Sequence, residues 1–211
     1  MPDVFDETVA TYRDEAGAAA FVAKERRFEE GRNGRVHSLF DVYDMRGWRV
    51  LDVGCGFGRD VKEFRLRGAD AYGCDVSEPL LAQAEREFGP YFKVWDVRAG
   101  GEVPFGGGFD FVWCCALLVH IPREELMRVL ETLWAGLREG GRLAIITKCG
   151  EGQTVTQNLG EGLGRVMVMY GVNEIVDVLK GFGAEIEVAD AGHSATAFGE
   201  ALLAVWARKP E

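Results

Sequence analysis

Residues 50–60, Val-Leu-Asp-Val-Gly-Cys-Gly-Phe-Gly-Arg-Asp, constrain the fold more than any other segment of this chain. The apolar, β-branched run before the first glycine is typical of a buried parallel strand. Glycines at alternate positions allow a sharp turn and let a ligand approach the backbone closely. A helix that begins directly afterwards would point its N-terminal N–H groups at that ligand. The segment therefore predicts a nucleotide-type site at the carboxyl end of a strand.

The glycine spacing and a neighbouring charge favour a cationic ligand over a phosphate. A G-x-G-x-x-G fingerprint needs glycine where Arg59 stands, and no G-x-x-x-x-G-K-[ST] loop follows the strand. Asp52, two residues before the first glycine, would repel a pyrophosphate and attract a positive charge. A nicotinamide-dependent dehydrogenase is therefore the less favoured alternative.

Strand-like and helix-like segments alternate through the rest of the chain, which predicts an α/β fold with a doubly wound, mostly parallel sheet. Beyond the first strand we expect strands at 71–74, 91–95, 109–116 and 143–148, and helices at 58–67, 78–88, 123–137 and 174–180. Residues 149–164 are glycine-rich and polar, which predicts a loop, and a short extended piece is expected at 167–170. Too few residues separate the last two strand-like runs, 184–188 and 197–208, for a helical crossover, so we expect an antiparallel hairpin.

The N-terminal residues are rich in helix-forming side chains. Helix is expected from Val4 to about Leu39, with few breakers between Ala16 and Phe28. We interpret residues 1–40 as a helical cap, part of which closes over the ligand as a lid. Residues 41–211 are then one compact domain, because the sequence shows no repeat and no second core.

Two further acids stand where predicted strands end. Asp75 lies roughly 20 residues past the glycine turn, where nucleotide-binding α/β units place an acid for the ribose hydroxyls. Ser77 is the expected N-cap of the next helix, which would leave Asp75 for a ligand. Asp96 follows the third strand, and taken alone it is more typical of a turn.

In their order and spacing, these features resemble the class I S-adenosylmethionine-dependent methyltransferases of the small, free-standing kind. The matching features are the D-x-G-x-G-x-G turn, Asp75, the Asp96-Val97 pair, the Gly140-Gly141 turn and the terminal hairpin. The resemblance implies a Rossmann-like, seven-stranded sheet, with S-adenosylmethionine as cofactor and S-adenosylhomocysteine as product. It assigns these residues to the cofactor: Tyr12, Asp52, Gly54, Cys55, Gly56, Gly58, Asp75, Val76, Asp96, Val97 and Cys114.

The resemblance also implies methyl transfer to an oxygen, nitrogen or sulfur atom of a small molecule. Such an in-line displacement needs positioning and desolvation more than an acid or base. His120 is the leading candidate for a general base, because imidazole accepts a proton near neutral pH; a structural half-buried histidine is the alternative. Lys148, Glu151 and Tyr170 are candidates for the acceptor site, against solvated loop charges and core packing. A non-catalytic module that binds the cofactor or its product is the second alternative.

The composition limits which classes of partner the protein can bind and indicates its cellular compartment. The formal net charge of -10 argues against broad binding to nucleic acid or to an anionic membrane surface. The DNA-methylation motif D-P-P-Y is absent after the fourth strand, and no apolar run or basic leader indicates a membrane span or a secretory signal. Five cysteines without C-x-x-C spacing and three histidines predict reduced thiols, a cytoplasmic protein and no metal. Oligomeric state is left open.

Overall fold

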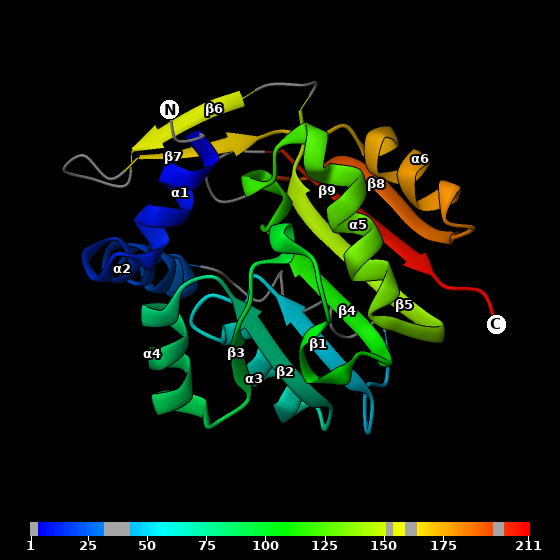
Figure 1. Cartoon of the computed structure of the whole chain (residues 1–211), viewed down its shortest axis with the longest axis horizontal. Coiled ribbons are helices and arrows are strands. Elements are labelled where there is room, and N and C mark those ends of the chain that lie inside the picture. Colours follow the sequence, from blue (N-terminus) through cyan, green and yellow to red (C-terminus); the bar gives the residue numbers. More distant parts are fainter. Residues whose placement is uncertain (1–3, 32–42, 151–153, 159–163, 196–200) are drawn as a thin grey trace.

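The computed structural model describes residues 4–31, 43–150, 154–158, 164–195 and 201–211, which form a three-layer α/β structure (Figure 1). Its seven-stranded sheet has the order β3-β2-β1-β4-β5-β9-β8. The strands are β1 Arg49–Val53, β2 Asp70–Asp75, β3 Phe92–Val94, β4 Phe109–Cys115, β5 Leu137–Lys148, β8 Glu185–Ala195 and β9 Ala201–Arg208. The first five are parallel, and β9 pairs antiparallel with both β5 and β8. The predicted Rossmann-like sheet and its terminal hairpin are confirmed.

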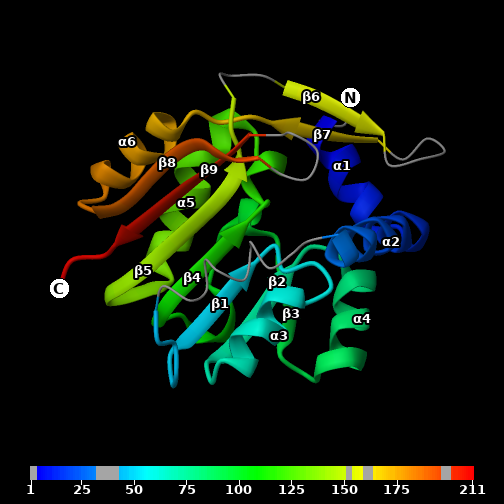
Figure 2. The same ribbon diagram turned by 180° about the vertical axis from the view of Figure 1, so that it is seen from behind.

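Helices cover both faces of this sheet. Their bounds are α3 Arg59–Leu66, α4 Glu78–Phe88, α5 Leu126–Ala135 and α6 Val172–Gly181. The helices α5 and α6 cover the face seen in Figure 1, and α3 covers the opposite face, seen in Figure 2. Successive side chains of β4 serve the two layers in turn, since Trp113 packs in the core with α3 and α4 whereas Val112 and Cys114 pack in the core with α5 and α6.

The connection from α5 to β5 differs from the expected one. The helix ends at Ala135 with Gly136 as its C-cap, and β5 begins at Leu137, six residues earlier than the sequence indicated. The Gly140-Gly141 pair therefore lies inside the strand, where the register with β4 is irregular, and not in a turn before it. A Cβ at Gly141 would lie 2.8 Å from the Phe109 carbonyl oxygen, so this irregularity needs a residue without a side chain.

The expected loop at 149–164 was wrong, because the segment contains half of a β-hairpin. The strands β6 Thr154–Asn158 and β7 Gly164–Val168 pair antiparallel as a separate two-stranded sheet. The β-branched run at 154–156 supports a strand, but the surrounding glycines hid that signal. The following helix begins at Val172 with Gly171 as N-cap, and not after Asn173, because the Glu174 carboxylate accepts from the Gly171 N–H at 2.6 Å.

The N-terminal segment forms two helices and not one. Helix α1 Val4–Arg13 ends before Asp14, whose carboxylate accepts from the Gly17 N–H at 2.9 Å near the start of α2 Glu15–Gly31. An aspartate at this position stabilises the start of the second helix, because its carboxylate binds a backbone N–H of the first turn. Residues 32–39 of the expected helix lie outside the described residues. Helix α1 lies against β7, and α2 lies against α4 (Figure 1).

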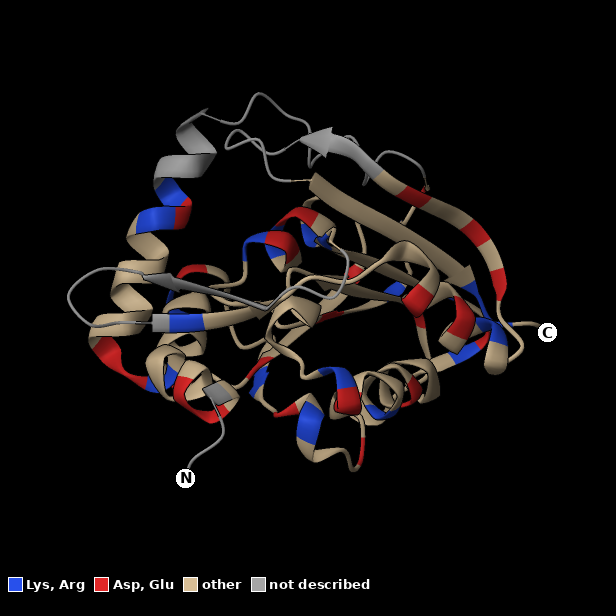
Figure 3. Cartoon of the chain, turned by 90° about the horizontal axis from the view of Figure 1, so that it is seen from above, with Lys and Arg blue, Asp and Glu red and all other residues tan. Residues whose placement is uncertain are grey.

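Charged residues of both signs are interspersed over the described surface. Figure 3 shows this from above, with acidic residues recurring along the outer strand β8. Such charges on an edge strand oppose pairing with another chain. Within the described ranges, none of the helices has both the length and the apolar character that a membrane crossing requires.

Candidate functional site

The turn from β1 to α3 is held in place by the end of β2. The N–H groups of Gly54 and Cys55 both donate to the Cys74 carbonyl, at 2.8 and 3.1 Å. Gly58 has a φ of +81°, and a Cβ there would lie 2.7 Å from Cζ of Phe92. Only glycine combines that backbone angle with that close packing. The glycine turn is thus a consequence of packing against two neighbouring elements as well as of its own flexibility.

Asp75 closes β2 with its carboxylate fixed by backbone groups. One oxygen accepts from the Gly56 N–H and the other from the Ser77 N–H, both at 2.9 Å. The Ser77 side chain caps α4 by accepting from the Leu80 N–H, as expected. The Ser77 backbone N–H nevertheless binds Asp75, so Asp75 is not left to a ligand alone. Burial raises the pKa of Asp75, while these backbone bonds oppose that rise. The remaining lone pairs of the two oxygens are aligned for further donors such as hydroxyl groups.

Two more acids, Asp52 and Asp60, flank the glycine turn. Asp52 is 3% exposed, and Asp60 is buried with its oxygens accepting from Trp113 Nε1 at 2.9 Å and from Arg59 Nε at 2.7 Å. Burial, and then the neighbouring Asp60 charge, raise the pKa of Asp52 well above its usual range. Asp52, Asp60 and Asp75 make this end of β1 and β2 electrostatically negative, which suits a cation and opposes a phosphate.

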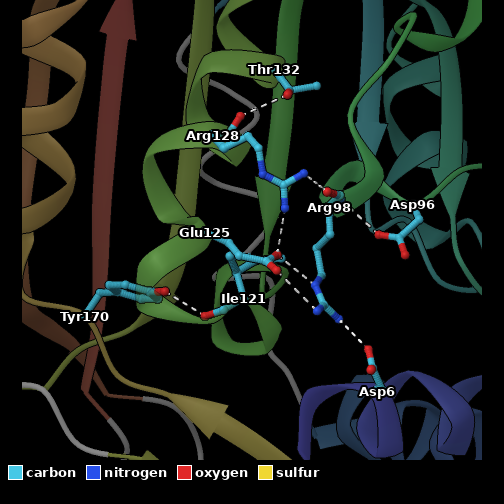
Figure 4. Close-up of polar contacts among 8 residues, drawn as sticks. All are labelled: Asp6, Asp96, Arg98, Ile121, Glu125, Arg128, Thr132 and Tyr170. Atoms are coloured by element: carbon cyan, nitrogen blue, oxygen red, sulfur yellow. Dashed lines mark hydrogen bonds and ion pairs between the residues drawn. The ribbon is translucent and has the colours of Figure 1, made fainter. Parts of the chain in front are cut away.

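The loop after β3 is tied to α5 and to α1 by ion pairs, shown in Figure 4. Asp96 caps the short helix Val97–Ala99 by accepting from the Arg98 N–H at 2.9 Å. The Arg98 guanidinium binds Glu125 at 2.9 Å and reaches Asp6 of α1 at 3.4 Å. Arg128 binds both Glu125 and the Arg98 carbonyl. Asp96 is therefore a turn residue, as its position alone suggested, on a loop that this network fixes.

Three side chains from distant parts of the chain meet between α1, β7 and the end of β4. Tyr12 Oη lies 3.2 Å from Nε2 of His120 and 2.8 Å from Nη1 of Arg165. Nδ1 of His120 lies 3.2 Å from the Val166 carbonyl oxygen. Thr8 Oγ1 accepts from the Val166 N–H at 2.9 Å, which joins α1 to the same strand. We call Tyr12, His120 and Arg165 the roof triad.

The hydrogen-bonding roles in the roof triad follow from chemistry. Arginine only donates, so the Tyr12 oxygen accepts from Arg165 and its own proton points to His120 Nε2. A carbonyl only accepts, so His120 carries its proton on Nδ1, facing Val166. Burial, and next the charge of Arg165, lower the pKa of His120 to about 3. His120 is therefore a neutral imidazole with both nitrogens engaged in this structure.

The other predicted site residues fall into three groups. Gly56, Val76 and Lys148 lie at the ends of the parallel strands, and Arg13 Nε donates to the Val76 carbonyl at 3.3 Å. Buried in the cores are Cys55, Val97, Cys114 and Tyr170, whose hydroxyl donates to the Ile121 carbonyl at 2.7 Å. Glu151 lies outside the described residues.

Arg165 is the site residue that sequence reasoning missed. It is 8% exposed and sits on β7, between the segment expected to be a loop and the short extended piece expected at 167–170. A lone arginine preceding an apolar run of strand-forming residues is the signal that could have indicated it. All five cysteines are free, and no group of three potential metal ligands occurs in the part of the chain the structure describes.

Comparison with known proteins agrees with this geometry. A family model described as a methyltransferase domain matches residues 50–141. Malonyl-[acyl-carrier protein] O-methyltransferase of Salmonella typhimurium is 29% identical over 67% of this chain and 57% of its own length. Magnesium-protoporphyrin O-methyltransferase of Synechocystis is 30% identical over 61% of this chain and 57% of its own length. The chain thus spans little more than half the length of these relatives.

Solved structures share the fold. The solved DhpI-SAM-HEP complex matches this structure over 98% of both chains, with a TM-score of 0.77 at 17% identity. An S-adenosylmethionine dependent methyltransferase from Mesorhizobium loti covers 85% of this chain and 99% of its own, with a TM-score of 0.68 at 20% identity. Residues 50–141 thus match a methyltransferase domain, and the glycine turn and the strand order agree with those of the class I S-adenosylmethionine-dependent methyltransferases.

Proposed function

We propose that this protein transfers a methyl group from S-adenosylmethionine to a small-molecule acceptor. The observation that carries the proposal is the arrangement of Asp52 and Asp75 at the ends of β1 and β2, around a glycine turn that belongs to a methyltransferase domain. Both curated relatives described above are named O-methyltransferases. Their names favour oxygen over nitrogen or sulfur as the acceptor atom.

The residues present fit this cofactor. Asp75, held by two backbone N–H groups, has the geometry to accept from a pair of ribose hydroxyls. Asp52 and its acidic surroundings suit the ammonium and sulfonium charges. Asp96 and Val97, on the loop that Arg98 fixes, are proposed to face the adenine. Tyr12, which joins the roof triad to Ser77 through its backbone carbonyl, is proposed to cover the cofactor.

Catalysis is proposed to rest on positioning. The cofactor supplies an activated methyl group and a neutral leaving group. The chain would exclude water with α1 and the β6–β7 hairpin, and would align the acceptor at the ends of β4 and β5. Lys148, Glu151 and Tyr170 stay predictions for that side. His120 as a general base also stays a prediction, and its closed hydrogen bonds favour a positioning role instead.

Isothermal calorimetry tests the cofactor assignment. We expect S-adenosylmethionine and S-adenosylhomocysteine to bind with clear heat and NADH to give none. Asp75→Asn should weaken S-adenosylhomocysteine by about tenfold, because a hydroxyl-binding carboxylate is lost. Asp70→Asn, an exposed acid on the same strand, is the control and should leave binding unchanged. NADH binding without S-adenosylmethionine binding would reverse the proposal in favour of a dehydrogenase.

A non-catalytic binding module is the second candidate, favoured by the lack of an available base at His120. Labelled methyl transfer into a metabolite extract separates the two. Transfer that falls in at least one of His120→Ala, Lys148→Ala and Glu151→Ala supports the enzyme. Tight binding without turnover across broad extracts supports the module.

We also propose a domain organisation and a cellular compartment for this protein. We infer that residues 1–40 act as a cap and 41–211 as one catalytic unit, supported by the contacts of α1 with β7 and α2 with α4. The five free cysteines support a reducing compartment such as the cytoplasm.

A further inference from the structure

The roof triad divides the site into two electrostatic halves. The backbone carbonyl of Tyr12 accepts from the Ser77 hydroxyl, two residues beyond Asp75, so this end of the residue lies on the acidic, cofactor side. Its phenol oxygen, at the opposite end of the same residue, lies 2.8 Å from the Arg165 guanidinium. A single residue therefore spans the distance between the acids of β1 and β2 and the cations beyond β4.

The acceptor half is cationic. Arg165 is buried on β7, and Lys148 is half-buried at the carboxyl end of β5. Both charges act on His120, where they add to burial in lowering its pKa. A guanidinium presents planar, paired donors that match an oxyanion such as a carboxylate or a phosphonate.

Neither His120 nor Tyr170 is available to deprotonate an acceptor. His120 Nε2 receives the Tyr12 proton and Nδ1 faces a carbonyl. The Tyr170 hydroxyl donates to the Ile121 carbonyl, and burial raises its pKa. A neutral alcohol or phenol would have to lose its proton during the transfer, whereas an oxyanion has already lost it in solution.

Resting on the proposed function, we propose that the methyl acceptor is an oxyanion already ionised at neutral pH, a carboxylate or a phosphonate, bound by Arg165 with the help of Lys148. An electron pair of its oxygen forms the new O–CH3 bond while the S–CH3 bond breaks and leaves its pair on sulfur. A sulfonium and an anion become a neutral thioether and a methyl ester. No proton moves, so His120 positions Tyr12 and Arg165 and accepts none from the substrate.

The experiment uses the full chain, labelled S-adenosylmethionine and a metabolite extract separated by ion exchange into anionic, neutral and cationic fractions. We expect label to enter the anionic fraction. Release of labelled methanol in mild alkali identifies a carboxylate ester, and alkali-stable label in a product that has lost a negative charge identifies a phosphonate ester. Label incorporated only when the neutral or cationic fraction supplies the acceptor overturns the inference while leaving the proposed function intact. Binding of S-adenosylhomocysteine without label in any fraction counts against catalysis itself.

Arginine variants test the assigned residue. Arg165→Gln should raise the KM for the active acidic fraction at least about tenfold, and Arg165→Lys should recover part of that loss. The same fraction should raise the melting temperature of the S-adenosylhomocysteine-loaded wild type but not of Arg165→Gln. Arg46→Gln, which alters an exposed ion pair with Asp44, is the matched control. An unchanged KM and an unchanged melting shift in an Arg165→Gln protein that still binds S-adenosylhomocysteine would refute the role of Arg165.

Discussion

The Tyr12 hydroxyl lies 3.2 Å from Nε2 of His120, although 108 residues separate the two in the chain. One belongs to the N-terminal helix and the other to the turn that follows β4. Arg165 joins them from the β6–β7 hairpin, 153 residues from Tyr12. One hydroxyl group thus links two elements outside the Rossmann-like sheet to the turn after β4, at the place where we propose that the acceptor binds.

Removing that hydroxyl should destabilise the protein. Tyr12→Phe keeps the ring packing against Phe21 but deprives Arg165 and His120 of a buried partner. We expect a loss of about 1–2 kcal/mol in the free energy of unfolding, measured by urea denaturation. Tyr72→Phe, which removes an exposed bond to Asp70, should change it by less than about 0.5 kcal/mol. Equal effects of the two substitutions would show that the roof triad adds nothing to stability.

Cofactor binding should depend on pH through Asp52. Its pKa is raised by burial and by Asp60, so it takes up a proton at a higher pH than an ordinary aspartate. Only the ionised form attracts a cation, and S-adenosylmethionine should therefore bind more weakly as the pH falls through this raised pKa. Calorimetry across pH should show the slope in the wild type and a weaker, flatter response in Asp52→Asn. A wild-type affinity independent of pH would contradict this assignment.

The raised pKa of Asp52 makes the stability of the ligand-free protein change with pH in the opposite direction from the cofactor affinity. Folded Asp52 keeps its proton where the unfolded chain has lost it, so its contribution to stability is present at low pH. That contribution is lost as the pH rises from the usual aspartate pKa through the raised one. Asp52→Asn should remove this part of the pH dependence of urea unfolding, whereas Asp70→Asn should retain it.

The ion-pair network of Arg98 should act on the adenine end of the cofactor. Arg98→Gln removes the guanidinium that joins the Asp96 loop to Glu125 and Asp6. We expect S-adenosylhomocysteine to bind about three- to tenfold more weakly, while S-ribosylhomocysteine, which lacks adenine, changes little. Calorimetry with both ligands measures the difference. Arg67→Gln, which breaks an ion pair between the C-cap of α3 and Glu63, is the control. A parallel loss for both ligands would mean that the loop does not contact the adenine.

Comparing alanine substitutions at Gly58 and Gly183 separates the stability cost of a positive φ from the cost of steric overlap. Gly58 and Gly183 have φ values of +81° and +80°, but only at Gly58 would an added Cβ meet other atoms within 4 Å. Gly183→Ala should cost about 1 kcal/mol of stability, and Gly58→Ala about 2–4 kcal/mol, because Phe92 must also move. Urea denaturation gives both values. A loss at Gly58 no greater than at Gly183 would show that Phe92 moves freely.

Local patterns in the sequence were sufficient for the sheet and for the positions of two acids of the candidate site. Alternating apolar segments, helix caps such as Ser77 and the glycine turn depend on neighbouring residues, and they placed Asp52 and Asp75 at strand ends. Parallel strands bring their carboxyl ends to one edge, which explains why the structure places these two acids close enough to interact. The register irregularity at Gly141 and the β6–β7 hairpin were missed, because glycine is common to turns, bulges and loops alike.

Only the tertiary structure decided what covers that site. The sequence determined that Tyr12 is on a helix, that His120 follows a strand and that Arg165 precedes an apolar run. Their meeting depends on how α1 packs against β7 and the sheet, and contacts over more than 100 residues leave no periodic signal in either segment. Burial at that junction also sets the low pKa of His120, since the cost of charging a group depends on what surrounds it and not on its chain neighbours.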